Sequence, residues 1–406
     1  MSLSQRQPLS GVRVLDFFWL IAGPLTTRIL ADFGAEVIKV ESSQRPDQIR
    51  TGAVRREGDR DPDAATVFAD CNSGKRGITL NLNVPEGVQL ARRLAGVSDI
   101  VTNNFTGDRM DRWGLGYESL RAINPGLIVA SMPAMGVSGP RRRYGANGNG
   151  VAAAAGFNAL MGFPGRPPVG MGSLYPDFTN PFHAATAIFA ALHHRNRTGQ
   201  GQFLDIGQFQ ANVSLLDTEI LDYTVNGIAA GQSANRSPHS CPHGVFRCAG
   251  DDAWCAIEVT SDAQWQALCQ VLERPDLATD ARLATLSGRK AHEDAIDHAL
   301  EAWTSTRDRR AVMVGLQRVG IPAGVVQTLQ DMLERDERLR TEHFQRVVHP
   351  AGYDFTVQRI PIRRNGVPTP ASPHPSIGQD NEYVMGELLG LPEVEIDRLY
   401  VEGVLA

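Results

Sequence analysis

The stretch VRVLDFFWLIAGPLTTRILADFGAEVIKVE, residues 12–41, determines the fold expected at the start of the chain. It opens with an apolar run from Val12 to Phe18 and closes with a second apolar run at 37–40. Between them, a Gly23-Pro24 break precedes apolar residues at helical spacing, and Gly34 ends that pattern. Two strands joined by one helix predict a βαβ unit with parallel strands and a right-handed crossover.

The same alternation continues along the first half of the chain. The strand-like segments GITLNLN (77–83) and DIVTNNF (99–105) flank a helical segment, PEGVQLARRLAG (85–96). A further strand is predicted in GLIVASMPAMG (126–136). The first half is therefore expected to form a doubly wound parallel sheet whose ligands bind at the carboxyl ends of the strands.

A dinucleotide-binding site is not expected on this sheet. Glu41 ends the second predicted strand, where a dinucleotide fold places the acid that binds a ribose hydroxyl. The preceding turn, however, has the sequence AGP at 22–24 rather than G-x-G-x-x-G, so it offers no cradle for a pyrophosphate. A nicotinamide or flavin dehydrogenase is thus disfavoured, and Glu41 is expected to be a solvated strand end.

Composition excludes several other classes of function. The 406 residues are 42% hydrophobic and 21% charged, with a formal net charge of −5 and no basic stripe, so nucleic acid is not an expected partner. No segment reaches the roughly 18 unbroken apolar residues that span a bilayer, and the N-terminus lacks a signal-peptide pattern. Five cysteines, an odd number, favour reduced thiols. The sequence therefore predicts a cytoplasmic protein without a membrane partner.

One acid in GSLYPDFTNPFHAATAIFAAL, residues 172–192, stands out. Asp177 lies just before an apolar run at helical spacing, near the N-terminal end of a predicted buried helix. Asp177 itself is a suitable N-cap, but Thr179 or Asn180 lie closer to Pro181 and could serve as the cap instead. The residues alone leave open whether Asp177 is a capping or a catalytic residue.

With these segments in view, the chain resembles the class III CoA-transferases, a family that includes formyl-CoA and carnitine CoA-transferases and shares its fold with the α-methylacyl-CoA racemases. The resemblance covers nearly the whole chain and rests on five segments in the family's order: 8–41, 72–90, 99–132, 175–206 and 375–390. It implies that Asp177 is a covalent nucleophile, which attacks an acyl-CoA thioester to form an aspartyl anhydride and then an aspartyl-CoA thioester. A carboxylate suits this role because every nucleophile in the cycle is already an anion.

The resemblance also implies where coenzyme A is bound as a substrate, with no tightly bound cofactor expected. The matching contact residues are Ile21, Ala22, Leu80, Asn81, Leu82, Asn83, Asn104, Phe105 and Arg112. Two basic residues of formyl-CoA transferase match Ser42 and Asn83 in this chain, so we expect other cations to hold the CoA phosphates. The candidates are Arg45, Arg50 and the run Arg141 to Arg143.

An α-methylacyl-CoA racemase or epimerase is the main alternative. Racemases of this fold pair the aspartate with a histidine in the segment that matches YGANGNGVAAAAG, residues 144–156. Here that segment offers Asn147 and Asn149, and asparagine does not exchange protons near neutral pH. Both asparagines are instead expected to contact substrate. A non-catalytic CoA-binding protein is a further alternative, although it would gain nothing from a nucleophilic Asp177.

The expected domain organisation has a large and a small part. Residues 1–210 form the first part of a large, Rossmann-like CoA-binding domain, and 211–234 form a linker. A smaller α/β domain is predicted at 235–335, and residues 336–406 form a second linker and return to the large domain. The family resemblance also implies an interlocked homodimer in which each chain threads through the other.

The segment SPHSCPHGVFRC in the smaller domain does not predict a metal site. His239, Cys241 and His243 would share one face of a strand, but their spacing fits no standard zinc signature. His239 is therefore expected to lie in a substrate-facing loop. Together the residues and the resemblance predict a CoA-transferase acting on carboxylic acids, with dicarboxylates favoured by the abundant Arg and Asn near the site. Transfer between two molecules and transfer within one molecule remain equally open.

Overall fold

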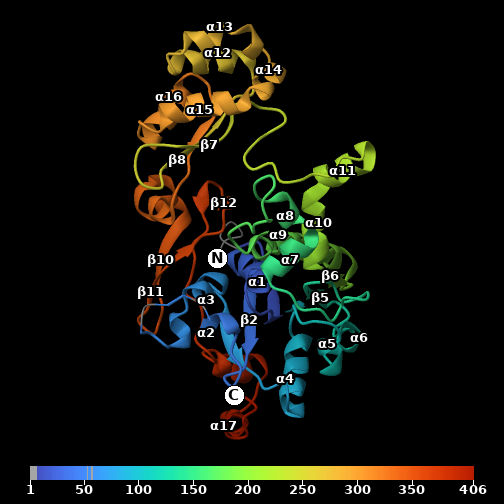
Figure 1. The fold of residues 1–406 in the computed structure, drawn as a ribbon. Coiled ribbons are helices and arrows are strands. Elements are labelled where there is room, and N and C mark those ends of the chain that lie inside the picture. The colour runs from blue at the N-terminus through green and yellow to red at the C-terminus, as the bar shows by residue number, and fades with distance from the viewer. Residues whose placement is uncertain (1–6, 53, 56–57) are drawn as a thin grey trace. The chain divides into compact units, whose positions relative to one another are not determined.

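A six-stranded parallel sheet forms the centre of the larger part of the protein (Figure 1). The computed structural model describes residues 7–52, 54–55 and 58–406. In spatial order, the strands are β3 (Arg76–Thr79), β2 (Glu36–Glu41), β1 (Arg13–Phe17), β4 (Ile100–Asn103), β5 (Ile128–Ser131) and β6 (Phe203–Asp205). Within the βαβ unit, Val14 pairs with Val37, and β1 pairs with β4 on its other side.

Alternate residues of the central strands point to two different hydrophobic clusters, as both faces of a parallel sheet require. Leu15 and Ile38 belong to the cluster that contains helices α4 (Pro85–Gly96) and α17 (Glu393–Val401). On the opposite face, Val14 and its neighbours pack against α1 (Ala22–Asp32) and α9 (Tyr175–Thr198). Helices thus cover both faces, which confirms the predicted doubly wound α/β architecture.

The chain divides into two compact units. The larger consists of Met1–Asn158, Gly170–Ala230 and Glu337–Ala406, and the smaller of Ala159–Val169 and Gly231–Asp336. The other α-helices of the larger unit are α2 (Gln48–Gly52), α3 (Thr66–Cys71), α5 (Arg109–Arg112), α6 (Tyr117–Arg121), α7 (Gly148–Ala155), α10 (Gln208–Val213) and α11 (Asp217–Asn226). Helix α8 (Phe157–Leu160) begins in the larger unit and ends in the smaller one. The larger unit also has two antiparallel pairs of strands: β10 (Phe344–Val348) with β11 (Asp354–Gln358), and β12 (Arg363–Arg364) with β13 (Val367–Pro368).

The smaller unit has an antiparallel sheet with helices. Its strands are β7 (His243–Arg247), β8 (Trp254–Glu258) and β9 (Ala323–Val325), in that order. Its helices are α12 (Asp262–Val271), α13 (Pro275–Thr279), α14 (Leu286–Ala291), α15 (Glu293–Thr304) and α16 (Arg309–Arg318). Its core is built around the fully buried Trp265.

Residues 211–234, for which a linker is predicted, contain a helix. Helix α11 occupies Asp217–Asn226 of this segment, and none of its residues is buried. Helical periodicity of apolar residues does not predict this helix because none of its side chains is buried in a core. None of the helices in the described residues is both long and apolar enough to cross a membrane.

Candidate active site

Asp177 lies in the first turn of α9, which begins at Tyr175. Its backbone N–H donates to the Leu174 carbonyl at 2.8 Å, and the helix has no side-chain N-cap. The predicted capping role of Thr179 or Asn180 is therefore wrong, because both residues lie inside the helix. The helix begins earlier than predicted since Pro176, at its second position, needs no partner for a backbone N–H.

The Asp177 carboxylate meets the amino end of a second helix, α7. Gly148 is the first residue of α7, and its backbone N–H donates a hydrogen bond to the Asp177 carboxylate. A Cβ atom at Gly148 would lie 2.8 Å from Asp177 Oδ2, so the approach depends on glycine at this position. The positive end of the α7 dipole faces the carboxylate and favours its charge. The amide that favours the charge of Asp177 thus comes from α7 and not from Asp177's own helix.

Two opposing effects set the acidity of Asp177. Burial raises the pKa of Asp177 from 3.8 to about 6, and the Gly148 hydrogen bond acts in the opposite direction. Within the described residues, no side-chain cation forms an ion pair with Asp177. The carboxylate is thus ionised at neutral pH but poorly solvated and unpaired, a state that leaves its oxygens available as nucleophiles.

A buried amide network supports this turn of α9. Asn180 is fully buried, its Nδ2 donates to Gln208 Oε1 at 3.2 Å, and its Oδ1 accepts from Asn212 Nδ2 at 2.8 Å. Gln208 Nε2 in turn donates to the Met132 carbonyl, just beyond β5, at 3.1 Å. The network fixes α9 against α10 and the sheet. Sequence reasoning missed it, although polar residues four apart on α10 were a usable signal.

The three predicted substrate contacts have different environments. Asn147 is the N-cap of α7, and its side chain accepts from the Gly150 N–H at 3.0 Å, so it orients the helix that faces Asp177. Asn149 is exposed in the first turn of the same helix. His239 is exposed in the smaller unit, where its backbone N–H donates to Ser237 Oγ.

In the described residues, no group of three or more His, Cys, Asp or Glu side chains could hold a metal ion.

A cavity of about 290 Å³ lies beyond the ends of β1 and β4. Because β2 and β4 lie on opposite sides of β1, this is the switch point where doubly wound sheets bind ligands. The lining residues are Trp19, Leu20, Arg45, Gln48, Leu82, Asn83, Asn104, Phe105, Thr106, Arg109 and Trp113.

Four of the predicted CoA contacts line this cavity and five do not. Leu82, Asn83, Asn104 and Phe105 line it. Leu80 is buried in the core, and Asn81 holds the C-terminal segment by donating to the Gly403 carbonyl at 3.2 Å. Ile21 is the N-cap of α1 and Ala22 its first residue, directly after the lining residue Leu20. Arg112 is exposed and pairs with Asp108 at 3.4 Å.

Three side chains that sequence reasoning missed complete the cavity together with the predicted Phe105: Trp19, Trp113 and Arg109. The Trp19 and Phe105 rings meet edge to face at 6.1 Å, and Phe105 meets Trp113 in the same way at 5.4 Å. The Arg109 guanidinium lies 5.4 Å from the centre of the Trp113 ring. An aromatic wall next to a cation suits a nucleotide, whose base stacks and whose phosphates are anionic.

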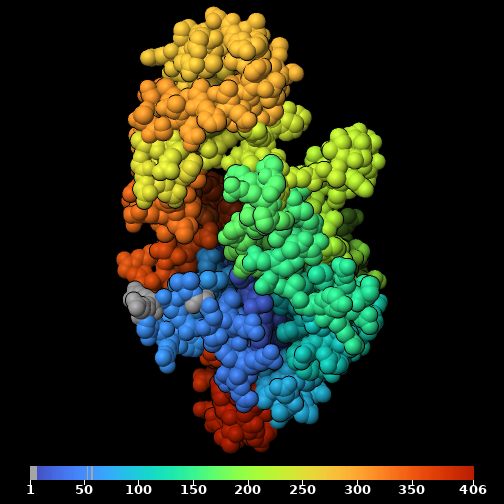
Figure 2. Space-filling view, viewed as in Figure 1, coloured from blue at the N-terminus to red at the C-terminus, as the bar shows by residue number. Residues whose placement is uncertain are grey.

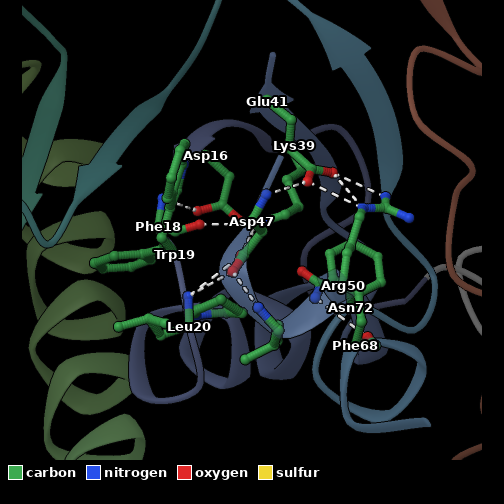
Figure 3. Close-up of polar contacts among 12 residues, drawn as sticks. Asp16, Phe18, Trp19, Leu20, Lys39, Glu41, Asp47, Arg50, Phe68 and Asn72 are labelled. Atoms are coloured by element: carbon green, nitrogen blue, oxygen red, sulfur yellow. Dashed lines mark hydrogen bonds and ion pairs between the residues drawn. The ribbon is translucent and has the colours of Figure 1, made fainter. Parts of the chain in front are cut away.

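The basic residues expected to hold phosphate have different environments, and Figure 3 shows Arg50 beside Glu41. Arg50 is fully buried and binds Glu41, with Nη2 2.8 Å from Oε2, and also Asp63. Arg50 is therefore not available to a ligand, and the prediction of a solvated Glu41 is wrong because this ion pair buries it. Arg143 is exposed and pairs with Asp108 at 3.3 Å. Arg45 lines the cavity with no ion-pair partner in the described part of the chain.

The larger unit therefore contains a half-buried aspartate without an ion-pair partner in the described residues and, separately, a cavity of about 290 Å³ beyond the ends of β1 and β4. A model of CoA-transferase family III matches residues 9–381 of the sequence. The chain belongs to CoA-transferase family III. The predicted family is thereby confirmed.

Relatives in this family resemble the chain over its full length. It is 34% identical to a succinyl-CoA–D-citramalate CoA-transferase of Chloroflexus aurantiacus, over 99% of this chain and 100% of the relative. It is 30% identical to a succinate–glutarate CoA-transferase of Agrobacterium fabrum, over 95% and 96% of the two chains. The crystal structure of a CAIB/BAIF family protein from Brucella suis superimposes with a TM-score of 0.85 at 32% identity, covering 95% of this chain and 100% of that one.

Proposed function

We propose that this protein transfers CoA from an acyl-CoA thioester to a dicarboxylic acid, with Asp177 as the covalent nucleophile. The observation that carries the proposal is the Asp177 carboxylate, half-buried and without an ion-pair partner in the described residues, against the Gly148 N–H. The named relatives act on succinyl-CoA or succinate with citramalate or glutarate, which are dicarboxylic acids, and this supports the substrate class.

The transfer occurs in four steps that need no net proton transfer. An Asp177 oxygen attacks the thioester carbonyl carbon, the carbon–sulfur bond breaks, and CoA leaves as its thiolate. The thiolate then attacks the aspartyl carbonyl of the resulting anhydride, releasing the donor acid and forming an aspartyl-CoA thioester. The acceptor carboxylate displaces CoA from this thioester, and the thiolate attacks the acceptor's acyl carbon. Asp177 is thereby regenerated as a carboxylate.

The amino end of α7 supplies the electrostatic assistance. Each step passes through a tetrahedral oxyanion, and preorganised N–H groups stabilise such charge without reorganisation. The Gly148 N–H faces the reacting carboxylate, and the Asn147 cap keeps this end of the helix ordered. Racemisation remains disfavoured because neither Asn147 nor Asn149 can act as the second acid/base group.

The test of this function is a covalent trap. The protein is mixed briefly with a panel of acyl-CoA thioesters, quenched with hydroxylamine, and analysed by intact and peptide mass spectrometry. We expect an aspartyl hydroxamate at Asp177 with succinyl-CoA or another dicarboxylic donor. Absence of any adduct, with exchange of the α-hydrogen of a branched acyl-CoA for deuterium, would instead support the racemase.

We infer that Arg109 and Arg45 hold the phosphates of CoA in the cavity beyond β1 and β4. Both line the cavity, whereas Arg112 is paired with Asp108 outside it. We therefore expect Arg109→Ala to raise the KM for acyl-CoA by about tenfold with little change in kcat, because one charge-assisted contact is lost. Arg112→Ala is the matched control on the same helix. A larger effect of Arg112→Ala than of Arg109→Ala would reverse the assignment.

We further propose that the protein is a homodimer, as the family resemblance implies. Helix α11 exposes Ile220, Leu221, Tyr223 and Val225, and it projects from its unit in the space-filling view, in yellow-green (Figure 2). A helix with unburied apolar side chains needs a partner surface, and a second copy of the chain supplies one. Light scattering should give twice the mass of one chain, and a monomer at micromolar concentration would contradict the proposal.

A further inference from the structure

The loop between β1 and α1 is held by side chains from β1 itself and from more distant parts of the chain (Figure 3). The Phe18 N–H donates to Asp16, and the Phe18 carbonyl accepts from Lys39 Nζ at 2.8 Å. Asn104 holds both backbone groups of Trp19, accepting from its N–H at 3.1 Å and donating to its carbonyl at 2.7 Å. Every one of these contacts comes from a buried or half-buried side chain, so the loop conformation is imposed on it.

Leu20 is the strained residue of this loop. Its φ is +68°, in the left-handed region that costs a non-glycine residue about 1 kcal/mol or more. Its N–H donates to Asp47, at 3.1 Å to Oδ1 and 3.2 Å to Oδ2. Leu20 also lines the cavity beyond β1 and β4. The Asp47 contact therefore offsets the strain and places a cavity residue.

Asp47 is linked to cavity residues from two segments of the chain. Its side chain is fully buried and accepts from the lining residue Leu20, while Arg45 and Gln48, close to it in the sequence, also line the cavity. Its carboxylate also accepts from Lys39 Nζ at 3.0 Å, in an ion pair that is completely buried.

Lys39 is held in its charged form. Burial favours the neutral amine of Lys39, but the nearby carboxylates, Asp47 foremost, hold its pKa above the usual range. The Lys39 ammonium group therefore orients the Asp47 carboxylate, to which it donates, while the same carboxylate accepts from the Leu20 N–H.

We propose that Asp47, oriented by Lys39, is a positioning residue that sets the CoA cavity by holding Leu20 in its left-handed conformation. The inference rests on the proposed CoA site, because it deepens that function rather than adding another. A purely structural role for the pair would predict a loss of stability without a separate loss of CoA affinity.

Two double variants separate these roles. Lys39→Met with Asp47→Asn, and Lys39→Met with Asp47→Ala, both remove the two charges and so leave no unpaired buried ion. Only the Asn variant keeps an oxygen that accepts from the Leu20 N–H. The two proteins therefore differ in whether the Leu20 N–H has an acceptor, and the Ile49 N–H, which donates to Asp47 Oδ1 at 3.3 Å, loses its acceptor in the same Ala variant.

The two double variants are compared by hydrogen exchange, by calorimetric binding of CoA and by thermal melting. We expect the Ala variant to show faster exchange in peptides covering 18–22 and an affinity for CoA about tenfold weaker than that of the Asn variant, since a buried donor loses its acceptor. Melting temperatures of the two should agree within a few degrees. In kinetics the difference should appear in the KM for acyl-CoA more than in kcat.

The outcomes test the positioning role of Asp47 and the proposed CoA site separately. Equal exchange and equal CoA affinity in the two variants would overturn the positioning role. So would an affinity that follows only the melting temperature. Faster exchange in the Ala variant, combined with no CoA binding by the unmodified protein, would overturn the proposed CoA site while the hold on Leu20 itself is confirmed.

Discussion

Asp177→Asn is expected to lower CoA transfer by at least about a thousandfold while leaving the protein folded, because the amide cannot form the anhydride. The variant should also give no hydroxamate in the covalent trap. Asn keeps the shape of the side chain, so the loss would report the missing nucleophile rather than a rearranged helix.

The stability of this variant provides an independent check. The pKa of Asp177 in the folded protein, about 6, lies above its ordinary value of 3.8, so the ionised form is disfavoured by folding. This loss of stability is absent at low pH, where Asp177 is protonated in both the folded and the unfolded protein. It reaches its full size above pH 6, where Asp177 is ionised in both. At pH 8 the neutral Asn avoids it, and the melting temperature of Asp177→Asn should equal or exceed that of the unmodified protein.

Steady-state transfer assays and calorimetric melting test both expectations together. Asp397→Asn, at an exposed aspartate of α17, is the control and should leave transfer unchanged. Retention of more than a tenth of the activity by Asp177→Asn would assign the chemistry to another group. A large drop in melting temperature would show that Asp177 is chiefly a structural residue.

The fold could be predicted from local pattern because the sheet is buried on both faces. The apolar runs around Leu15 and Ile38 needed no long-range information, and the helix at 85–96 has the predicted bounds. The buried ion pairs of the interior could not be predicted from local pattern. Glu41 and Arg50 are nine residues apart, but only the fold around Phe68, whose ring lies 3.5 Å from the Arg50 guanidinium, buries them together.

In the candidate site, too, some residues are predictable from the sequence, whereas their contacts depend on the fold. The family resemblance implies the role of Asp177, and in the ANGNG segment, residues 146–150, it indicates the asparagines rather than the glycines as functional residues. The structure shows that Gly148 makes room for the carboxylate while Asn147 caps the helix behind it. That pairing depends on the packing of α7 against α9, which no spacing in the sequence encodes.

Gly148→Ala should therefore be the second most damaging single change, with transfer at pH 7 lowered by about a hundredfold. The added Cβ would lie 2.8 Å from Asp177 Oδ2 and 3.0 Å from its Cγ, so the carboxylate must move away from the α7 amides. A displacement of about 1 Å at a reacting atom costs roughly this factor. The backbone of Gly148 is not in the left-handed region, so alanine adds no conformational strain there.

The pH profile identifies the cause of the loss. In the unmodified protein kcat/KM should fall as the pH drops below about 6, because protonation removes the nucleophile. A carboxylate moved away from the Gly148 N–H loses the contact that favours its charge, so the midpoint in Gly148→Ala should shift to higher pH. Gly150→Ala is the matched control, since its Cβ would meet only Ala146 and Asn147, at 3.4 and 3.5 Å. If both variants had the same activity and the same midpoint, the amino end of α7 would not be the group that stabilises the reacting carboxylate.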